Sequence, residues 1–430
     1  MKKIAIIGGG PAGIMAGTVA VQNNKNKVND KLEITIFDKS DPLKTLLYTG
    51  GGRCNLSYSE YDYKKLAQFF PRGEKFLLSP FSKFGPKDTQ EFFSKLGLET
   101  YTQDDNRIFP VSNDANDVRY TLLKTAENLG IIFKKSEIAK ITKSDNEFSI
   151  FDSDNNIYKY DKVVIATGGN RLKPKFSGYN LAESLGHSII ELKPALCGLK
   201  IKEEWCKKLS GISFKNLKGK VIFNGKKIKD IEGDLLFTHK GISGPLAYKT
   251  SSYCAYYDFN DKNPLILEIN FIGKPFDIFD KEFTLKINEN QKKKLSSIVS
   301  EYIPKSMSKI LLDELGLDIE ITAGSITREE RKKVAKALTE NQLNVISTST
   351  EGEVVTAGGI NLSEIDNRTM ESKLVNGLYF CGEIIDVDGL TGGFNLQNCW
   401  TSGYVVGMEI AGGWIMVSLS NNNFQLRKCY

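Results

Sequence analysis

The sequence predicts an α/β protein: a Rossmann-type nucleotide-binding domain interrupted by an inserted β-rich domain that carries a helical subdomain. Three observations predict this architecture. The chain opens with a short apolar strand, a glycine-rich turn and a helix of small residues. Glycine-rich turns follow apolar strands again at residues 161–169 and 378–399. From about residue 194 the pattern changes to alternating strands and then to helical spacing, before the glycine-rich turns return.

The composition is that of a globular protein with a sizeable core. Its 430 residues are enough for about three domains, and 40 % of them are hydrophobic. The net charge of +6 is spread over many lysines, which favours an ordinary solvated surface over a nucleic-acid site. Seven cysteines without a C-x-x-C pair and only two histidines predict no metal site and reduced thiols. No apolar run reaches the length of a membrane span, so a cytoplasmic protein without membrane contact is expected.

The first forty residues are typical of a dinucleotide-binding unit. An apolar strand leads into a G-x-G-x-x-G turn and a helix, and a second strand ends in Asp38. Gly8 makes the tight turn, Gly10 lets a pyrophosphate touch the backbone, and Gly13 lets the helix pack on the sheet. The helix N-terminus favours phosphate, and the Asp38 carboxylate can hold ribose hydroxyls. The motif therefore predicts a bound dinucleotide with an unphosphorylated adenosine ribose.

The late glycine-rich segment distinguishes a flavin from a nicotinamide cofactor. Residues 378–399 contain a strand that ends near Glu383, a second glycine pair and the start of a helix. A nicotinamide enzyme has no need of such a return. A flavoprotein needs a carboxylate near the ribityl chain and a helix N-terminus near the pyrimidine edge of the flavin. In residues 392–397, glycine backbone allows close approach, and Asn395 and Gln397 can both donate and accept hydrogen bonds. The cofactor predicted from this pattern is FAD.

Several motifs together resemble those of the HI0933-like flavoproteins, which are also labelled BaiN-like or aminoacetone-oxidase-like. They run in family order from Ile4 to Gly407, and so cover nearly the whole chain. The resemblance implies a tightly bound FAD, a three-part architecture and an NAD(P)/FAD-dependent oxidoreductase. The motifs are GGGPAG, TGGGRCN, RIFP, ATGG, LFTHKGISGP, VTAGGI, TMES and GLYFCGEIIDVDGLTGGFNLQ.

The resemblance also implies a position on the cofactor for each motif. It puts the pyrophosphate at the first glycine-rich turn, the adenosine ribose at Asp38 and the adenine at the main chain of Ile138. It puts Thr167 on the adenosine side, Glu383 near the ribityl chain or pyrophosphate, and the last glycine-rich segment beside the flavin ring. The cofactor-binding residues expected in all are Gly8, Gly10, Pro11, Ala12, Gly13, Asp38, Lys39, Gly50, Gly51, Gly52, Arg53, Cys54, Asn55, Ile138, Thr167, Gly168, Gly382, Glu383, Asp386, Gly392, Gly393, Phe394, Asn395 and Gln397.

Residues 49–55, TGGGRCN, are expected to lie against the flavin ring. A planar ring can lie on main chain only where no Cβ projects, which would explain the three glycines at 50–52. Arg53 either stabilises the reduced flavin or a substrate carboxylate, or it fixes the loop through backbone carbonyls. Cys54 is interpreted as a packed small residue rather than a redox thiol, because no partner cysteine is near in sequence. Asn55 is expected to pin the turn.

The middle of the chain is expected to be an inserted domain. Its strands alternate apolar and polar residues, and Asn224-Gly225 favours a two-residue hairpin turn. His239 is either a proton donor at the domain interface or a residue that holds its own turn. A substrate cleft is expected between the insertion and the flavin domain. The expected boundaries are 1–193 and 347–416 for the FAD-binding domain, 194–275 for the β-rich insertion, 276–318 for its helical subdomain, 319–346 for the rest of the insertion and 417–430 for a tail.

The predicted function is that of an FAD-dependent oxidoreductase that moves a hydride between flavin N5 and a small organic substrate. No second G-x-G-x-x-G is present, so NAD(P)H would dock transiently or the electrons would come from elsewhere. Reduction of activated C=C bonds and oxidation of amines by oxygen both stay open. An RNA-modifying flavoprotein is an alternative. The lack of a concentrated basic patch with interleaved aromatic residues counts against it. A flavin redox sensor without turnover is another. Arg53, Cys54 and His239 are the candidate catalytic residues.

Overall fold

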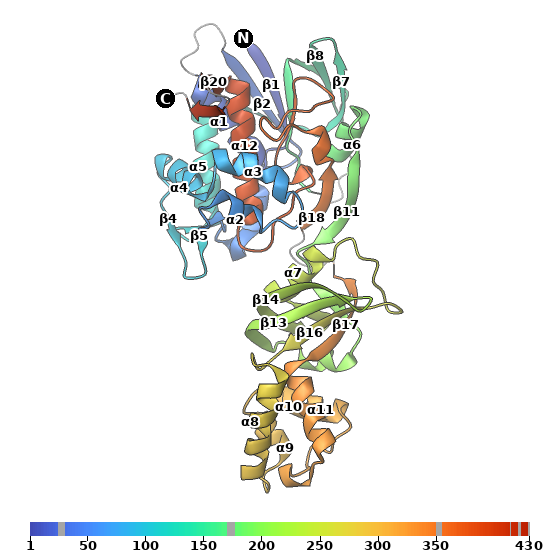
Figure 1. The fold of residues 1–430 in the computed structure, drawn as a ribbon. Helices are drawn as coiled ribbons and strands as arrows, with labels where there is room; N and C mark the ends of the chain where they lie inside the picture. Colours follow the sequence, from blue (N-terminus) through green and yellow to red (C-terminus); the bar gives the residue numbers. More distant parts are fainter. Residues whose placement is uncertain (25–30, 170–176, 350–354, 413, 420–422, 429–430) are drawn as a thin grey trace. The chain divides into compact units, whose positions relative to one another are not determined.

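The computed structural model of the chain (Figure 1) consists of two compact units. The first is formed by Met1–Lys193 together with Thr356–Tyr430, and the second by Pro194–Val355. The second unit extends beyond the expected boundary at 346, because strand β17 (Asn341–Thr348) still pairs within it. The structure describes residues 1–24, 31–169, 177–349, 355–412, 414–419 and 423–428.

The first unit is built on a five-stranded parallel sheet in the order β19 (Leu378–Phe380), β10 (Lys162–Ile165), β1 (Lys2–Ile7), β2 (Leu32–Asp38) and β6 (Ile132–Lys135). Every neighbouring pair in this sheet is parallel. The apolar residues of the central strands are buried, as expected for strands covered on both faces. The carboxyl ends of the strands therefore meet at one edge, which is where open α/β sheets bind their ligands.

Two helices from opposite ends of the chain lie side by side in this unit (Figure 1). They are α1 (Pro11–Asn24) and α12 (Phe394–Ala411), and 10 of the 14 residues of α1 are buried. Glycines of α12 allow the close approach. A Cβ at Gly403 would lie 2.5 Å from the Ala12 carbonyl oxygen, and one at Gly407 would lie 2.7 Å from that of Ala16. The start of the chain is thus locked to a helix that begins nearly four hundred residues later.

Smaller elements surround the sheet of the first unit. Two three-stranded sheets are present, of β3 (Ser57–Tyr58), β5 (Arg107–Pro110) and β4 (Thr100–Thr102), and of β7 (Ile138–Ser144), β8 (Glu147–Asp152) and β9 (Ile157–Tyr160). The two-stranded sheets are formed by β11 (Ile189–Ala195) with β18 (Val355–Ile360), and by β20 (Trp414–Leu419) with β21 (Asn423–Lys428) in the tail. The helices are η1 (Lys44–Gly52), α2 (Tyr63–Ala67), α3 (Glu74–Lys83), α4 (Pro86–Lys95), α5 (Ala115–Asn128), α6 (Gly178–Ser184), η4 (Leu362–Glu364) and η5 (Gly382–Ile384).

The second unit contains a closed six-stranded barrel. The predicted hairpin is present: Asn224 and Gly225 connect its strands with φ values of 49° and 72°, as a type I′ turn requires. A short 3-10 helix, η2 (Glu204–Leu209), and helix α7 (Pro245–Tyr253) also belong to this unit. The strand order is β12 (Leu199–Ile201), β15 (Gly241–Ser243), β14 (Lys226–Thr238), β13 (Ser213–Phe223), β16 (Leu265–Asn270) and β17.

Helices between β16 and β17 gather at one end of the barrel (Figure 1). They share one hydrophobic core with the barrel, which includes Phe237, Leu267, Phe283 and Leu338. None of the helices in the described part of the chain is both long and apolar enough to cross a membrane. The predicted fold class, α/β with a β-rich insertion that carries helices, is confirmed. The helical elements are α8 (Phe276–Glu289), α9 (Leu295–Val299), α10 (Lys305–Glu314), η3 (Ala323–Ser325) and α11 (Arg328–Thr339).

Candidate FAD site

The first glycine-rich turn lies at the carboxyl edge of the parallel sheet, between β1 and α1. A Cβ at Gly8 would collide with the Ala166 carbonyl oxygen, and one at Gly13 would collide with the carbonyl oxygen of Gly8. These two positions therefore need glycine for packing. Gly10 is different, because a Cβ there would have no atom within 4 Å. The protein leaves this space open, as a site for a pyrophosphate against the backbone requires.

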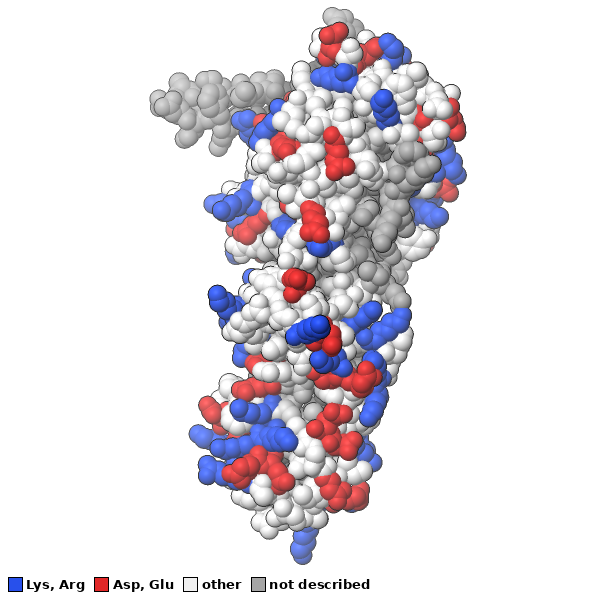
Figure 2. Space-filling model, turned by 90° about the vertical axis from the view of Figure 1, so that its right-hand side faces the viewer, with Lys and Arg blue, Asp and Glu red and all other residues white. Residues whose placement is uncertain are grey.

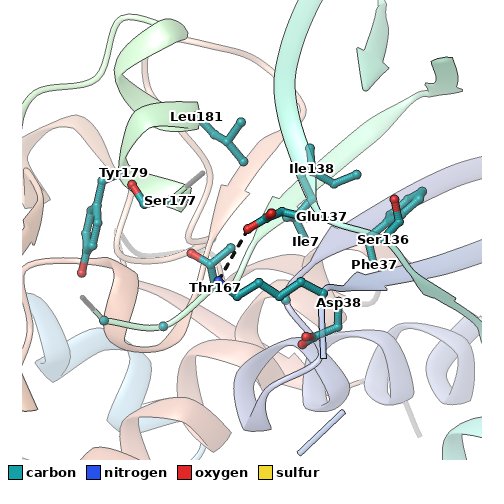
Figure 3. Close-up of a pocket in the computed structure, with 15 residues that line it drawn as sticks. Ile7, Phe37, Asp38, Ser136, Glu137, Ile138, Thr167, Ser177, Tyr179 and Leu181 are labelled. Carbon is teal, nitrogen blue, oxygen red and sulfur yellow. Dashed lines mark ion pairs between the residues drawn. The ribbon is translucent and has the colours of Figure 1, made fainter. Parts of the chain in front are cut away.

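A pocket next to this turn lies between the ends of β2 and β10 and the link from β6 to β7 (Figure 3). The pocket is partly open to solvent, and the empty space inside and in front of it amounts to about 550 Å³. The Asp38 carboxylate lines the pocket and accepts hydrogen bonds from the N–H groups of Gly9 and Ser40, both at 2.8 Å. The dashed line in Figure 3 marks the ion pair of Lys39 and Glu137, whose Nζ and Oε1 atoms are 3.6 Å apart.

The pocket brings together the residues predicted for the adenosine half of the cofactor, which are Gly8, Asp38, Lys39, Ile138, Thr167 and Gly168. Sequence analysis missed the contribution of α6, whose Ser177, Tyr179 and Leu181 form the side opposite Phe37 in Figure 3. One local signal was present, because Ser177 caps this helix by accepting the N–H of Asn180. The pocket residues that were not predicted are Ile7, Phe37, Ser136, Glu137, Gly169, Ser177, Gly178, Tyr179 and Leu181.

The three glycines of TGGGRCN all have left-handed backbone, with φ values of 58°, 69° and 85° at Gly50, Gly51 and Gly52. A Cβ at Gly50 would lie 2.7 Å from the Asn55 nitrogen, so this glycine is needed for packing within the loop. Gly51 and Gly52 are exposed, and a Cβ at either would have no atom within 4 Å. Gly51 and Gly52 thus present bare main chain to open space, as a planar ring would need.

Arg53 makes contacts within this loop. Its Nε donates to the Gly50 carbonyl at 3.3 Å, and its guanidinium carbon lies 4.2 Å from the centroid of the Phe109 ring. Of the two roles expected for Arg53, the structure shows the one that fixes the loop. A contact with flavin or substrate stays a prediction.

Cys54 is fully buried behind the glycines. Burial raises the pKa of its thiol to about 12, and a hydrogen bond with Thr49 only partly offsets this effect. Because the thiolate is the reactive form, a thiol with this pKa is inert near neutral pH. The structure therefore supports the interpretation of Cys54 as a packing residue.

We expect that replacing Cys54 by alanine leaves the rate of flavin reduction unchanged. The free energy of unfolding should fall by about 1 kcal/mol, a usual cost for a small buried truncation. In the native protein, Cys54 should resist iodoacetamide at about pH 8 and react only after unfolding in urea, as peptide mass spectrometry can show. Rapid alkylation of native Cys54 with loss of flavin reduction would instead indicate a redox thiol.

The early and late glycine-rich segments meet in the fold. A Cβ at Gly382 would lie 2.8 Å from the Cβ of Ala12, and one at Gly393 would lie 2.6 Å from the Ser57 carbonyl oxygen. With its amide turned to satisfy both neighbours, Asn55 accepts the N–H of Gly393 at 3.0 Å and donates to the Ser57 carbonyl. Asn55 thus pins the TGGGRCN loop to the start of α12.

The Glu383 carboxylate, which was predicted near the ribityl chain, lies beside the turn that follows β10. Its Oε1 accepts the N–H of Thr356 at 2.8 Å and would lie 2.5 Å from a Cβ at Gly169. Asp386 lies three residues further on, and burial raises its pKa. The Oδ1 atom of Asp386 is buried and has no hydrogen-bond partner among the described residues. A ligand hydroxyl, such as those of a ribityl chain, would satisfy it.

Side chains of the first turn of α12 face the protein interior. Gln397 is fully buried, where it accepts hydrogen bonds from Ser57 and Thr89 and donates to Thr401. Asn395 holds both backbone groups of Gly389, and Phe394 stacks on Phe69 with ring centroids 4.5 Å apart. Both amides are satisfied within the protein. We therefore expect the contact with a flavin, near Gly392 and Gly393, to come from backbone N–H groups at the helix start.

The two histidines belong to different units, His187 to the first and His239 to the second. His187 is buried, with its ring nitrogens 3.0 Å from a Glu364 oxygen and 2.8 Å from the Ser372 hydroxyl, which indicates a structural role. His239 is exposed in the turn between β14 and β15 of the second unit, and its role as a proton donor stays a prediction. Among the described residues, no group of three or more His, Cys, Asp or Glu side chains could hold a metal ion.

The residues at this edge fit FAD. The pocket suits an adenosine half, and Gly10 leaves room for a pyrophosphate. Gly51 and Gly52 leave room for a ring, and the start of α12 lies next to them through the Asn55 contact. The fold and the site together define a flavin-dependent oxidoreductase with FAD as its cofactor. More particularly, the chain belongs to the family described as HI0933-like protein Rossmann domain, whose model matches residues 2–409, and this confirms the resemblance of its motifs.

Curated relatives match over almost the whole chain. A 3-dehydro-bile acid delta(4,6)-reductase of Clostridium scindens is 27 % identical over 416 residues, which cover 96 % of this chain and 99 % of the relative. A ribosomal RNA dihydrouridine synthase of Escherichia coli is 26 % identical and covers 94 % of this chain and 97 % of its own length. A protein of the same description from Haemophilus influenzae is 25 % identical and covers 94 % of this chain and 98 % of its own length.

Proposed function

We propose that this flavoprotein reduces a C=C bond that is conjugated to a carbonyl group. The relatives support a common reaction of this kind. A delta(4,6)-reductase of a 3-dehydro-bile acid removes double bonds conjugated to a ketone, and a dihydrouridine synthase saturates the C=C bond conjugated to a carbonyl in uracil. Both reactions add a hydride to the carbon remote from the carbonyl and a proton to the carbon beside it. The hydride carries two electrons and one proton, and the acid supplies a second proton, so together they account for the two hydrogens added to the product.

The observation that carries this proposal is the bare main chain at Gly51 and Gly52 next to the start of α12. When bound, FAD supplies the hydride from N5 of its reduced ring. The two glycines leave one ring face in contact with backbone only. The helix start offers N–H groups and partial positive charge to the electron-rich pyrimidine edge of the reduced ring. The chain thus orients the ring and stabilises its reduced form.

NAD(P)H is the proposed electron donor, and it would bind transiently. The sequence contains one G-x-G-x-x-G motif, at residues 8–13, and this turn is the proposed pyrophosphate site of FAD, which the open space at Gly10 supports. We therefore propose no separate nicotinamide-binding domain.

Uridine in ribosomal RNA is a second candidate substrate, in addition to a small conjugated ketone. Two relatives with that printed activity match 94 % of this chain, the inserted unit included. A uracil base offers the same conjugated C=C bond to the ring, so both candidates need the same flavin site.

The proposal is tested by anaerobic titration of the FAD-loaded protein. NADH or NADPH should bleach the flavin absorbance, and an α,β-unsaturated ketone should restore it without oxygen, giving a product heavier by two hydrogens in mass spectrometry. The saturated ketone is the control and should restore nothing. An oligouridine tested in parallel decides between the two substrate classes. Reduction of the flavin by amines with re-oxidation by oxygen alone would contradict the proposal and favour an amine oxidase.

A further inference from the structure

We propose that the tip of the β13–β14 hairpin and the segment after α7 form a surface that binds single-stranded RNA. The surface consists of Lys226, Lys227, Lys229, Tyr253, Tyr256 and Tyr257, and we name it the Tyr–Lys surface. The inference rests on the second candidate substrate, uridine in RNA. It adds a place on the second unit where such a chain would be held.

The tyrosines come from the turn that ends α7. The N–H of Tyr257 donates to the Cys254 carbonyl at 3.0 Å, which turns the chain back over the barrel. Tyr256 and Tyr257 stay 43 % and 37 % exposed. The ring of Tyr257 packs edge-on against Phe223, the last residue of β13, with centroids 5.5 Å apart. At least one exposed ring is therefore held in a fixed place at the hairpin tip, ready to stack on a base without much loss of side-chain freedom.

The lysines come from the first residues of β14. Lys226, Lys227 and Lys229 are all exposed, and the Lys229 ammonium lies 4.9 Å from the centroid of the Tyr253 ring. Lys227 pairs with Asp230 at 2.7 Å, and both side chains are more than half exposed. Such an exposed pair is weak and its lysine can turn to a phosphate. The segment after α7 adds the acids Asp258 and Asp261, and Asp261 pairs with Lys202 at 3.1 Å. The three lysines of the surface thus outnumber the two remaining acids, Asp230 and Asp258.

Aromatic rings beside lysines are what sequence-tolerant binding of single strands requires, because bases stack on the rings and phosphates pair with the ammonium groups. The face of the molecule drawn in Figure 2 does not have the extended positive region that a duplex partner would need. Figure 2 shows lysine, arginine and acidic side chains interspersed over the described residues of one face, without an extended region of one sign. The cluster is not visible along the sequence, because the fold joins a hairpin tip to a segment more than twenty residues later.

Fluorescence anisotropy of a labelled oligouridine of about 12 nucleotides tests the surface on the full-length, FAD-loaded protein. Tyr256→Ala with Tyr257→Ala should weaken binding by about tenfold or more, and Tyr256→Phe with Tyr257→Phe should retain it, because the rings remain. Lys226→Gln with Lys227→Gln should lower the slope of log affinity against log salt by about 1.4. Matched controls are Lys292→Gln with Lys293→Gln, and Tyr61→Ala with Tyr120→Ala, which remove exposed side chains elsewhere and should bind as the unchanged protein does.

The outcomes separate this inference from the function on which it rests. Binding that the Tyr–Lys variants lose and the controls keep supports the surface, whether or not the bound uridines become reduced. A protein that does not bind oligouridine, or Tyr–Lys variants that bind like the controls, would overturn it. Re-oxidation of reduced flavin by an unsaturated ketone should be unaffected in every variant, so the flavin reaction is measured independently of RNA.

Discussion

Replacing Gly10 by valine should give a folded protein that purifies without FAD. A Cβ at this position would meet no protein atom within 4 Å, so we expect the fold to accept a valine. It would fill the space next to the backbone that a pyrophosphate needs. We expect the affinity for FAD to fall by at least about a hundredfold, which is about 2.7 kcal/mol. The visible spectrum and the flavin released on denaturation measure the loss, and circular dichroism with urea unfolding measures the fold.

Gly13→Ala is the matched comparison three residues further on. Here a Cβ would collide with the backbone carbonyl of Gly8, which cannot move aside as a side chain can. This variant should lower the free energy of unfolding by about 3 kcal/mol, by analogy with other overpacked sites. The two glycines of one motif thus separate cofactor binding from folding. A Gly10→Val protein that keeps one FAD per chain would show that the pyrophosphate lies elsewhere.

Replacing Arg72 by alanine should be the most destabilising change of a charged residue in the first unit. Arg72 meets the carboxylate of Asp388 through two nitrogens, and Asp388 is fully buried. Removing the arginine leaves a buried charge without its partner, at a cost of about 3–5 kcal/mol in the free energy of unfolding. The pair also fixes the loop that leads into α12, so FAD should be lost with stability. Urea unfolding and flavin content measure both effects.

Arg368→Ala is the control for this prediction. Arg368 also makes a two-nitrogen contact with a carboxylate, that of Asp366, but its side chain is 71 % exposed. Its loss should cost no more than about 1 kcal/mol. Exchanging both Arg72 and Asp388 for apolar residues, as in Arg72→Met with Asp388→Leu, should cost less than Arg72→Ala, because no unpaired charge remains. Equal losses in Arg72→Ala and Arg368→Ala would contradict the role assigned to the buried pair.

The parts of the site that follow from local sterics could be read from the sequence. Gly13 is required by a backbone contact with Gly8 within one strand–turn–helix unit, Gly8 belongs to the same standard motif although its own close contact is with Ala166, and Asp38 ends the next strand. The burial of Cys54 also agrees with its interpretation as a packing residue. In each case the determining atoms lie within the same short segment or in a standard motif.

The amides at the start of α12 show where local reasoning stops. Gln397 has the hydrogen-bonding groups that a flavin edge needs, but Ser57 and Thr89 occupy them from more than three hundred residues away. Arg53 is likewise held by a distant residue, through the contact of its guanidinium with the ring of Phe109 in strand β5. Sequence patterns give the chemical type of a side chain but not its distant partners. Those partners decide whether the side chain is left for a ligand.

Barrel closure was also beyond the sequence. Alternating residues predicted strands after residue 194, and Asn224-Gly225 predicted their hairpin correctly. Closure depends on β12 and β15, which are three residues each and carry too little pattern to be recognised. The expected boundary for the return to the first unit, at residue 347, cuts through β17 for the same reason. Residues 341–348 close the barrel through pairs with β12 and β16.

The close packing of α1 on α12 has a consequence for how the protein is made. About 370 residues separate the end of the first helix from the start of the second, and a ribosome needs about 20 to 75 s to add them. During that time the face of α1 that packs on α12 has no partner on the nascent chain, while the contiguous second unit can already fold. Cofactor capture is therefore a late event in biogenesis, and chaperones have a defined interval in which the emerging N-terminus needs protection.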